Sequence, residues 1–182
     1  MAILITPRTL LLPLTRRMIQ QRLERSSFDL DCAGPDGPLR VHFPAEWPGD
    51  PLHFFPAILA RLHPRQEDVQ PDTSFTVVTR AHPQAIGQLG TTGHTNAAGD
   101  LEIGYGMNPA VWGHGYATEA VGALVTHLHT LPGVRRVTAD TAVTNRASER
   151  VLEKVGFERT GISWSRDDGD LTTWAHPPKP SA

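Results

Sequence analysis

The strongest constraint on the fold is a strand that leads through a glycine-containing turn into a long helix, between Leu101 and Leu131. Across residues 101–107 an apolar side chain alternates with a carboxylate or a glycine, which is the period of a strand with one buried face. From Ala117 onward the apolar residues follow the i, i+3, i+4 spacing of a helix, which Pro132 ends. A half-buried strand joined to an amphipathic helix predicts a layered α/β fold.

Further helices and strands are predicted on either side of this element. Thr15 is placed to cap a helix that runs to about Ser26, and Asn145 to cap a shorter one that ends at Gly156 in a Schellman motif. We expect the remaining strands at 75–79, 86–89, 136–143, 157–164 and 171–175. Together these elements predict an α/β protein with a mixed, mostly antiparallel, twisted sheet of about six to seven strands and helices on both faces.

Proline is unusually abundant, with 16 residues among 182, about twice the average usage of ~5%. Half of these prolines lie in residues 35–71, which excludes a long helix or a central strand there. Two interpretations are open: a surface excursion, or a shaped wall beside a ligand. Aromatic residues such as Trp47 and Phe55 favour at least partial packing. The tail, 177–182, is expected to fray.

The composition limits the class of protein. At 182 residues the chain is long enough for one domain with a substantial core, so we expect a single domain over 1–182. The 17 basic and 19 acidic side chains lack the basic excess of a nucleic-acid binder. Cys32 is the single cysteine, which excludes an internal disulfide and favours a cytoplasmic protein. No targeting segment and no apolar run of about 18 residues is found, so we expect no membrane span.

The turn before the long helix contains Gly113 and Gly115, and it could bind a phosphate. A helix N-terminus offers unpaired N–H groups and a positive dipole end, and glycines let an anion approach them. Taken alone, a double-glycine helix start is equally well explained as ordinary turn chemistry. A competing motif fails: Gly99 and Gly104 have the spacing of a P-loop, but Tyr105 stands where that motif needs lysine.

Three segments, in this order, carry a family resemblance: 102–109, 112–120 and 145–157. They resemble the GNAT N-acetyltransferases, and within them most closely the branch of ribosomal-protein N-terminal acetyltransferases. The resemblance covers residues 70–175 well and the first helix loosely. It implies a single-domain GNAT fold over 1–182, but it does not specify the acceptor.

The resemblance implies an enzyme that uses acetyl-CoA as cosubstrate, without a metal, and transfers the acetyl group to a primary amine. The acceptor would be a protein N-terminus or a small molecule. The family often forms homodimers, but the sequence does not specify the oligomeric state. The backbone N–H near Met107 would polarise the thioester carbonyl. The pyrophosphate would lie on the turn formed by Trp112, Gly113, His114, Gly115, Tyr116, Ala117 and Thr118. Trp112 stands where the family usually has glutamine or arginine.

The family's catalytic residues match this sequence less well than its pyrophosphate-binding residues do. Asn145 matches a residue that contacts pantetheine, and it is equally well explained as a plain helix cap. Many relatives have a tyrosine at the position of Leu152, and it acts as the general acid that protonates the thiolate. Ser148, one turn earlier, is the substitute that this branch suggests, and the alternative is a simple capping role. Glu102 is the candidate base, directly or through water, against the alternative of a solvated strand glutamate. Asp140 is the weaker candidate.

The absent tyrosine leaves a second function open, a catalytically degenerate protein that binds CoA or an acyl-CoA as a sensor or scaffold. The histidines do not predict a metal site, because His127 and His129 point apart on one helix and no second cysteine or H-E-x-x-H motif is present. By analogy with the family, residues 35–71 are expected on the acceptor side.

Overall fold

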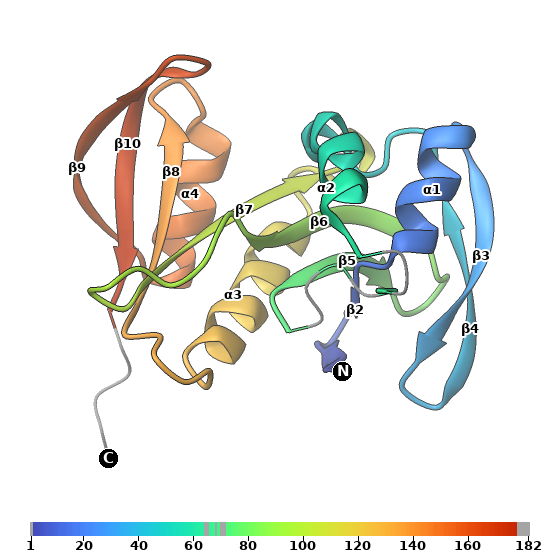
Figure 1. The fold of residues 1–182 in the computed structure, drawn as a ribbon. Coiled ribbons are helices and arrows are strands. Elements are labelled where there is room, and N and C mark those ends of the chain that lie inside the picture. Colours follow the sequence, from blue (N-terminus) through green and yellow to red (C-terminus); the bar gives the residue numbers. More distant parts are fainter. Residues whose placement is uncertain (1, 64–65, 68, 70–71, 178–182) are drawn as a thin grey trace. The chain divides into compact units, whose positions relative to one another are not determined.

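The computed structural model describes residues 2–63, 66–67, 69 and 72–177 (Figure 1). It divides into two compact units, which we describe separately. The first contains Met1–Gly90 and Tyr105–Ala120, and the second Thr91–Gly104 and Val121–Ala182. Strand β7 and helix α3 each contribute residues to both units.

The first unit is built on four antiparallel strands in the order β1-β2-β5-β6. Every residue of β2 is buried, and in its register Leu11 faces Val77 of β5. Burial on both faces explains why β2 has a continuous apolar run rather than an alternating pattern. The strands are β1 Leu4–Ile5, β2 Thr9–Pro13, β5 Ser74–Thr79 and β6 Ala85–Thr91.

Helix α1, Arg16–Glu24, begins at the predicted cap, since Thr15 Oγ1 accepts a hydrogen bond from Met18 N at 3.2 Å. It is followed by a hairpin of β3, Phe28–Gly34, and β4, Gly37–Phe43. The sequence predicted neither strand. Both strands of a two-stranded ribbon are edge strands. Such strands tolerate proline, which cannot donate a hydrogen bond to a neighbouring strand, so the prolines near the turn do not prevent this hairpin.

The proline-rich segment packs its aromatic residues into the first unit, as predicted. Phe43, Trp47 and Phe55 are fully buried, and the rings of Phe43 and Trp47 meet edge to face at 4.8 Å. Its helical parts are short, namely the 3-10 helix η1, Asp50–Phe54, and α2, Phe55–Arg61. Two of its eight prolines, Pro64 and Pro71, lie outside the described residues.

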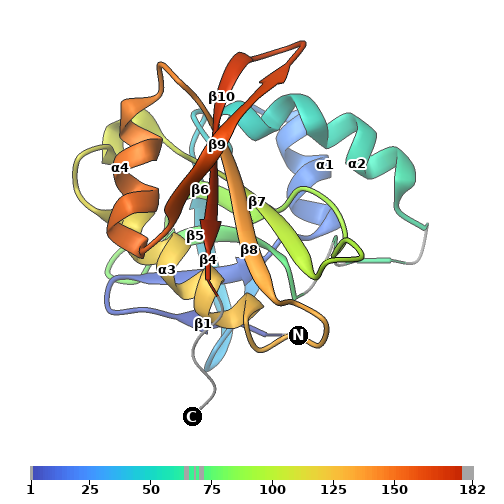
Figure 2. The ribbon, with the colours of Figure 1, turned by 90° about the vertical axis from the view of Figure 1, so that its left-hand side faces the viewer.

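In the second unit the strand order is β7-β8-β10-β9, with β8 parallel to β7 and the other pairs antiparallel. Figure 2 shows β8, β10 and β9 side by side with α4 beside them. The strands are β7 Asp100–Met107, β8 Arg136–Ala142, β9 Glu158–Ser165 and β10 Gly169–His176. The helices are α3 Tyr116–Leu128, which the two units share, and α4 Arg146–Val155.

The end of α4 confirms the predicted Schellman motif. Gly156 has φ +102°, Phe157 N donates to Leu152 O at 3.0 Å, and Gly156 N donates to Glu153 O at 3.1 Å. The mixed α/β class is also confirmed, but the described residues form ten strands, more than the six to seven expected. The surplus comes from β1 and β2, which do not alternate, and from the β3–β4 hairpin, which has prolines at its turn. Within the described residues, no helix is both long and apolar enough to cross a bilayer.

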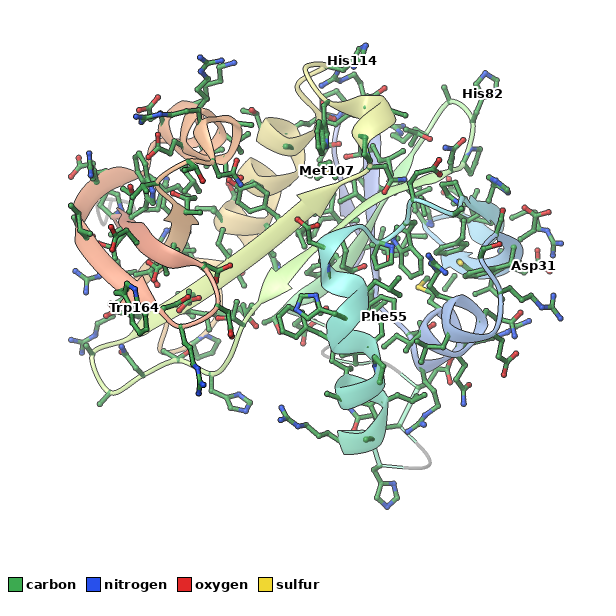
Figure 3. The ribbon with its side chains drawn as sticks, turned by 90° about the horizontal axis from the view of Figure 1, so that it is seen from above. Asp31, Phe55, His82, Met107, His114 and Trp164 are labelled. Atoms are coloured by element: carbon green, nitrogen blue, oxygen red, sulfur yellow. The ribbon has the colours of Figure 1, made fainter. Side chains whose placement is uncertain are left out.

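The aromatic cluster predicts that replacing two tryptophans by alanine lowers the free energy of unfolding by very different amounts. Trp47→Ala should lower the free energy of unfolding by about 3–5 kcal/mol, because it leaves a cavity among buried rings. Trp164, labelled in Figure 3, lies on β9. Its side chain is 69% exposed, so Trp164→Ala should lower the free energy of unfolding by less than about 1 kcal/mol. Urea unfolding of both variants checks this, and equal losses would contradict the assigned core.

Candidate functional site

The turn before α3 presents open backbone. Gly113 and Gly115 have φ of +76° and +80°, a left-handed conformation that other residues rarely adopt. A Cβ atom at Gly113 would meet nothing within 4 Å. Helix α3 begins directly afterwards at Tyr116, so the N–H groups of its first turn have no partner within the helix. Figure 3 shows His114 on this turn. The predicted glycine turn therefore has the local geometry of an anion site.

An arginine from the loop between β1 and β2 spans this turn. Arg8 Nε donates to Glu119 Oε2 at 2.6 Å, and Nη1 donates to the carbonyl oxygen of His114 at 2.9 Å. The guanidinium also lies 4.4 Å from the ring centre of Tyr116, a cation–π contact. Sequence reasoning missed Arg8, because no local pattern relates it to a helix more than a hundred residues away.

The carboxylate of Glu119 is the centre of this network and is only 15% exposed. Its Oε1 accepts from Thr6 Oγ1 at 2.6 Å and from the backbone N–H of Arg8 at 2.8 Å. Burial by itself raises the pKa of this carboxyl, but the hydrogen bonds from Thr6 and Arg8 outweigh burial and hold the pKa below its usual range. The first turn of α3 thus carries a negative charge that Arg8 neutralises.

The end of β7 places the backbone of Met107 next to the same turn. Asn108 N donates to Ile86 O of β6 at 2.8 Å, and successive N–H groups of a strand point to opposite edges. The N–H of Met107 is therefore directed away from β6. Its carbonyl oxygen accepts from Trp112 Nε1 at 2.7 Å, which holds an indole that is 65% exposed across the loop.

The proline-rich segment lies against β7 at this point. A Cβ at Gly106 would be 3.3 Å from Pro51 Cδ and 3.8 Å from Pro48 O, and Trp47 Nε1 donates to Gly87 O of β6 at 3.2 Å. The bare backbone predicted on this face of β7 thus accommodates the close approach of the prolines. A side chain at Gly106 would make a tight contact with Pro51, so glycine suits this close approach.

In the second unit, Glu102 lies on the exposed face of β7 and lines a polar cavity of about 240 Å³. Asp100, another lining residue, is held by Arg136 through two hydrogen bonds of 2.7 and 2.8 Å, which keep its pKa below the usual range. Within the described residues Glu102 makes no ion pair, so its carboxylate is available for a cation or a proton. The cavity is lined by Thr92, Gly93, His94, Asn96, Asp100, Glu102 and Thr138.

Helix α4 begins at Asn145, whose Oδ1 accepts from Ser148 N at 3.1 Å, so the predicted capping role is confirmed. Ser148 is half-buried in the first turn of α4. Leu152, where many relatives carry tyrosine, is fully buried in the core. Glu149 is also buried, and it accepts from Thr172 Oγ1 at 3.2 Å. This helix therefore offers Asn145 and Ser148 as its candidate polar groups.

The predicted site residues are divided between the units. Met107 and residues 112–118 belong to the first, where Trp112 contacts Met107, while Glu102, Asn145 and Ser148 belong to the second. Asp140, the weaker base candidate, is exposed and accepts from Ser163 Oγ at 3.4 Å.

The remaining candidate ligands and nucleophiles do not form a site. His129 Nε2 lies 3.0 Å from His176 Nδ1, and the described residues contain no group of three or more His, Cys, Asp or Glu side chains arranged to hold a metal. Cys32 is buried in the first unit, and burial raises the pKa of its thiol to about 11, so it is a poor nucleophile at neutral pH.

Comparisons with known proteins point to one family. The family model described as the acetyltransferase (GNAT) domain matches residues 46–158. The chain is 32% identical over 79 residues to the uncharacterized N-acetyltransferase YoaA of Bacillus subtilis, a match that covers 43% of this chain and 45% of YoaA. The chain thus spans about half the length of that relative.

Solved structures agree with the fold. An acetyltransferase (GNAT family) from Bacillus anthracis has a TM-score of 0.66 at 19% identity, covering 98% of this chain and 100% of its own. The aminoglycoside acetyltransferase AAC(6′)-Ib, solved in complex with coenzyme A, has a TM-score of 0.60 at 19% identity, covering 93% and 94%. Identities this low establish similarity of fold, and the fold expected from the sequence motifs is confirmed.

The Glu119 network predicts a stability contribution that depends on pH. Its folded pKa is depressed, so the contribution is present above the unfolded value of about 4.3 and is lost as pH falls through the folded pKa. Glu119→Gln should therefore be about 1–2 kcal/mol less stable than the native chain at neutral pH, and the difference should shrink at acid pH, as the pH falls through the folded pKa.

Urea unfolding at both pH values measures this difference. Glu46→Gln is the matched control, because within the described residues Glu46 is exposed and makes no ion pair. A Glu119→Gln deficit that stays constant with pH would contradict the assigned network.

Proposed function

The chain belongs to the GNAT acetyltransferase family, and from this premise we propose that it transfers an acetyl group from acetyl-CoA to a primary amine, as a single catalytic domain. The observation that carries the proposal is the open glycine turn, which lies inside the matched region and leads directly into α3. Phosphate-bearing ligands fit such a turn because N–H groups and the helix dipole both favour negative charge.

The residues present fit the pyrophosphate of CoA. Gly113 and Gly115 add no side chains of their own to the turn, and the N–H groups from Gly113 to Thr118 are the proposed donors. Trp112 replaces the usual polar side chain at the start of the motif, and its indole is hydrogen-bonded to Met107. We assign the phosphate contacts to the backbone, so that replacement does not remove them.

Bound at this turn, acetyl-CoA would supply a thioester whose acyl carbon an amine can attack. The N–H of Met107, directed away from β6, is the proposed donor to the oxygen that becomes negative during the attack. Asn145 uses its Oδ1 for the helix cap, which leaves its Nδ2 as the proposed contact to pantetheine. These groups orient the thioester and stabilise developing charge.

On the acceptor side, Glu102 is the proposed base. Its carboxylate takes a proton from the ammonium, directly or through water, so that the amine lone pair can form the N–C bond. The amine nitrogen becomes positive as the N–C bond forms, and it loses its second proton to water when the C–S bond breaks. The leaving thiolate, which keeps the electron pair of that bond, takes a proton from the hydroxyl of Ser148, which regains one from solvent. Two observations support this role: Glu102 lines a polar cavity, and it makes no ion pair with any residue that the structure describes.

The acceptor class is proposed from the segment that packs beside Met107. The contact of Pro48 and Pro51 with Gly106 supports the hypothesis that residues 35–71 form a wall on the acceptor side. A protein N-terminus is one candidate acceptor, because the motifs resemble those of the ribosomal-protein N-terminal acetyltransferases. A small-molecule amine is the alternative acceptor, because the fold is also similar to that of an aminoglycoside acetyltransferase.

The burial of Leu152 favours one alternative function. With no tyrosine acid at that position, the chain could bind CoA or an acyl-CoA as a sensor or scaffold without turnover. Release of free thiol from acetyl-CoA, measured against a panel of peptide and small-molecule amines, separates the two functions. Binding without turnover of any amine would favour the sensor.

The glycine turn predicts the effect of one substitution on cofactor binding. Gly115→Glu places a carboxylate and a strained left-handed residue at the phosphate seat, so CoA-dependent stabilisation should disappear. In the native chain this stabilisation should reach about 2.7 kcal/mol at a CoA concentration about a hundred times Kd.

Thermal unfolding with and without CoA measures the loss. Gly133→Glu is the matched control, because Gly133 has φ +83° and an open Cβ position but lies at the other end of α3. Stabilisation that survives in Gly115→Glu would place the phosphates elsewhere.

The catalytic assignments predict distinct losses of turnover. Glu102→Gln should lower kcat by about a hundredfold or more, and Ser148→Ala by at least about tenfold, with CoA binding retained in both. Asp140→Asn serves as the comparison and should keep near-native turnover. If only Asp140→Asn loses activity, the assignment of the base to Glu102 is wrong.

A further inference from the structure

The proposed mechanism gives no role to one charged group beside the glycine turn, the guanidinium of Arg8. Arg8 belongs to the loop between β1 and β2, yet its side-chain hydrogen bonds go to the turn and first helical turn at residues 114–119. Its Nη2 would lie 3.5 Å from a Cβ at Gly115. An arginine fixed on both sides of the glycine turn is well placed to influence what that turn binds.

A cation beside Glu119 favours the binding of an anion at the glycine turn. Glu119 lies in the first turn of α3, where the proposed pyrophosphate would also approach. Two like charges that share a helix N-terminus repel, and partial burial of the carboxylate strengthens the repulsion. The pair with Arg8 at 2.6 Å removes most of that repulsion.

The geometry of Arg8 adds a second effect. Its bond to the carbonyl of His114 and its bonds to Glu119 hold the chain before and after Gly115. A planar guanidinium is suited to this, because it presents several donors in a fixed arrangement. The N–H groups that face an anion are thereby kept in one orientation.

We propose that Arg8 is a positioning residue for the pyrophosphate of CoA, acting through Glu119, whose charge it neutralises beside the glycine turn. This inference rests on the proposed function. This role differs from one that only holds the fold together. It requires that the charge of Glu119 weakens CoA binding when Arg8 is absent.

The test compares CoA dissociation constants, measured by isothermal titration calorimetry, in the native chain and in matched variants. Arg8→Gln exposes the Glu119 charge and should raise Kd about tenfold. Adding Glu119→Gln to it removes that charge and should bring Kd back to within about threefold of the native value, although the tie stays broken. Arg17→Gln, an exposed arginine of α1, should leave Kd unchanged.

Arg8→Lys keeps the positive charge and covers the case in which Arg8→Gln does not fold. It should bind CoA with near-native Kd even if its melting temperature falls. The inference is overturned if Arg8→Gln binds CoA as tightly as the native chain, if the double variant is as weak as Arg8→Gln, or if Arg8→Lys is as weak as Arg8→Gln. If the native chain does not bind CoA, the proposed function itself fails, whereas native binding with any of those outcomes leaves that function standing.

Discussion

The ion pair between Arg8 and Glu119 joins the loop after β1 to the first turn of α3. It matters because a helix N-terminus has unpaired donors, and their use depends on how firmly that turn is held. Thr6 and the backbone of Arg8 complete the shell of the Glu119 carboxylate. The open conformation of Gly113 and Gly115 is thus supported from outside the turn. The proposed pyrophosphate contacts lie on this turn.

The proline-rich segment gives the first unit a second organising contact. Its prolines prevent long regular elements, but its aromatic rings fill the core and its backbone lies against Gly106 of β7. Rigid residues that pack closely onto a strand can shape a surface with little loss of entropy on folding. An acceptor-side wall built in this way would be pre-organised. This agrees with its proposed role beside Met107.

Much of the fold and part of the site could be predicted from local patterns. The strand β7, with the alternation of its first residues up to Ile103, the cap at Asn145 and the Schellman motif at Gly156 are confirmed because each depends on residues close in the sequence. The β3–β4 hairpin was missed, although buried and exposed residues alternate in β3, because Pro35 and Pro38 at its turn argued against strands there. Local motifs also located the glycine turn and Glu102. They could not show that Glu102 lines a cavity within its unit.

The sequence by itself determined which segments become strands, turns and helices around residues 101–131, and the motifs there identified the family. Local rules suffice for this, because backbone preference and hydrophobic period act over a few residues. Only the tertiary structure decided that Arg8 neutralises Glu119 and that Pro51 approaches Gly106. Such contacts join residues tens to over a hundred positions apart. They are set by how strands and helices pack, which no local pattern records.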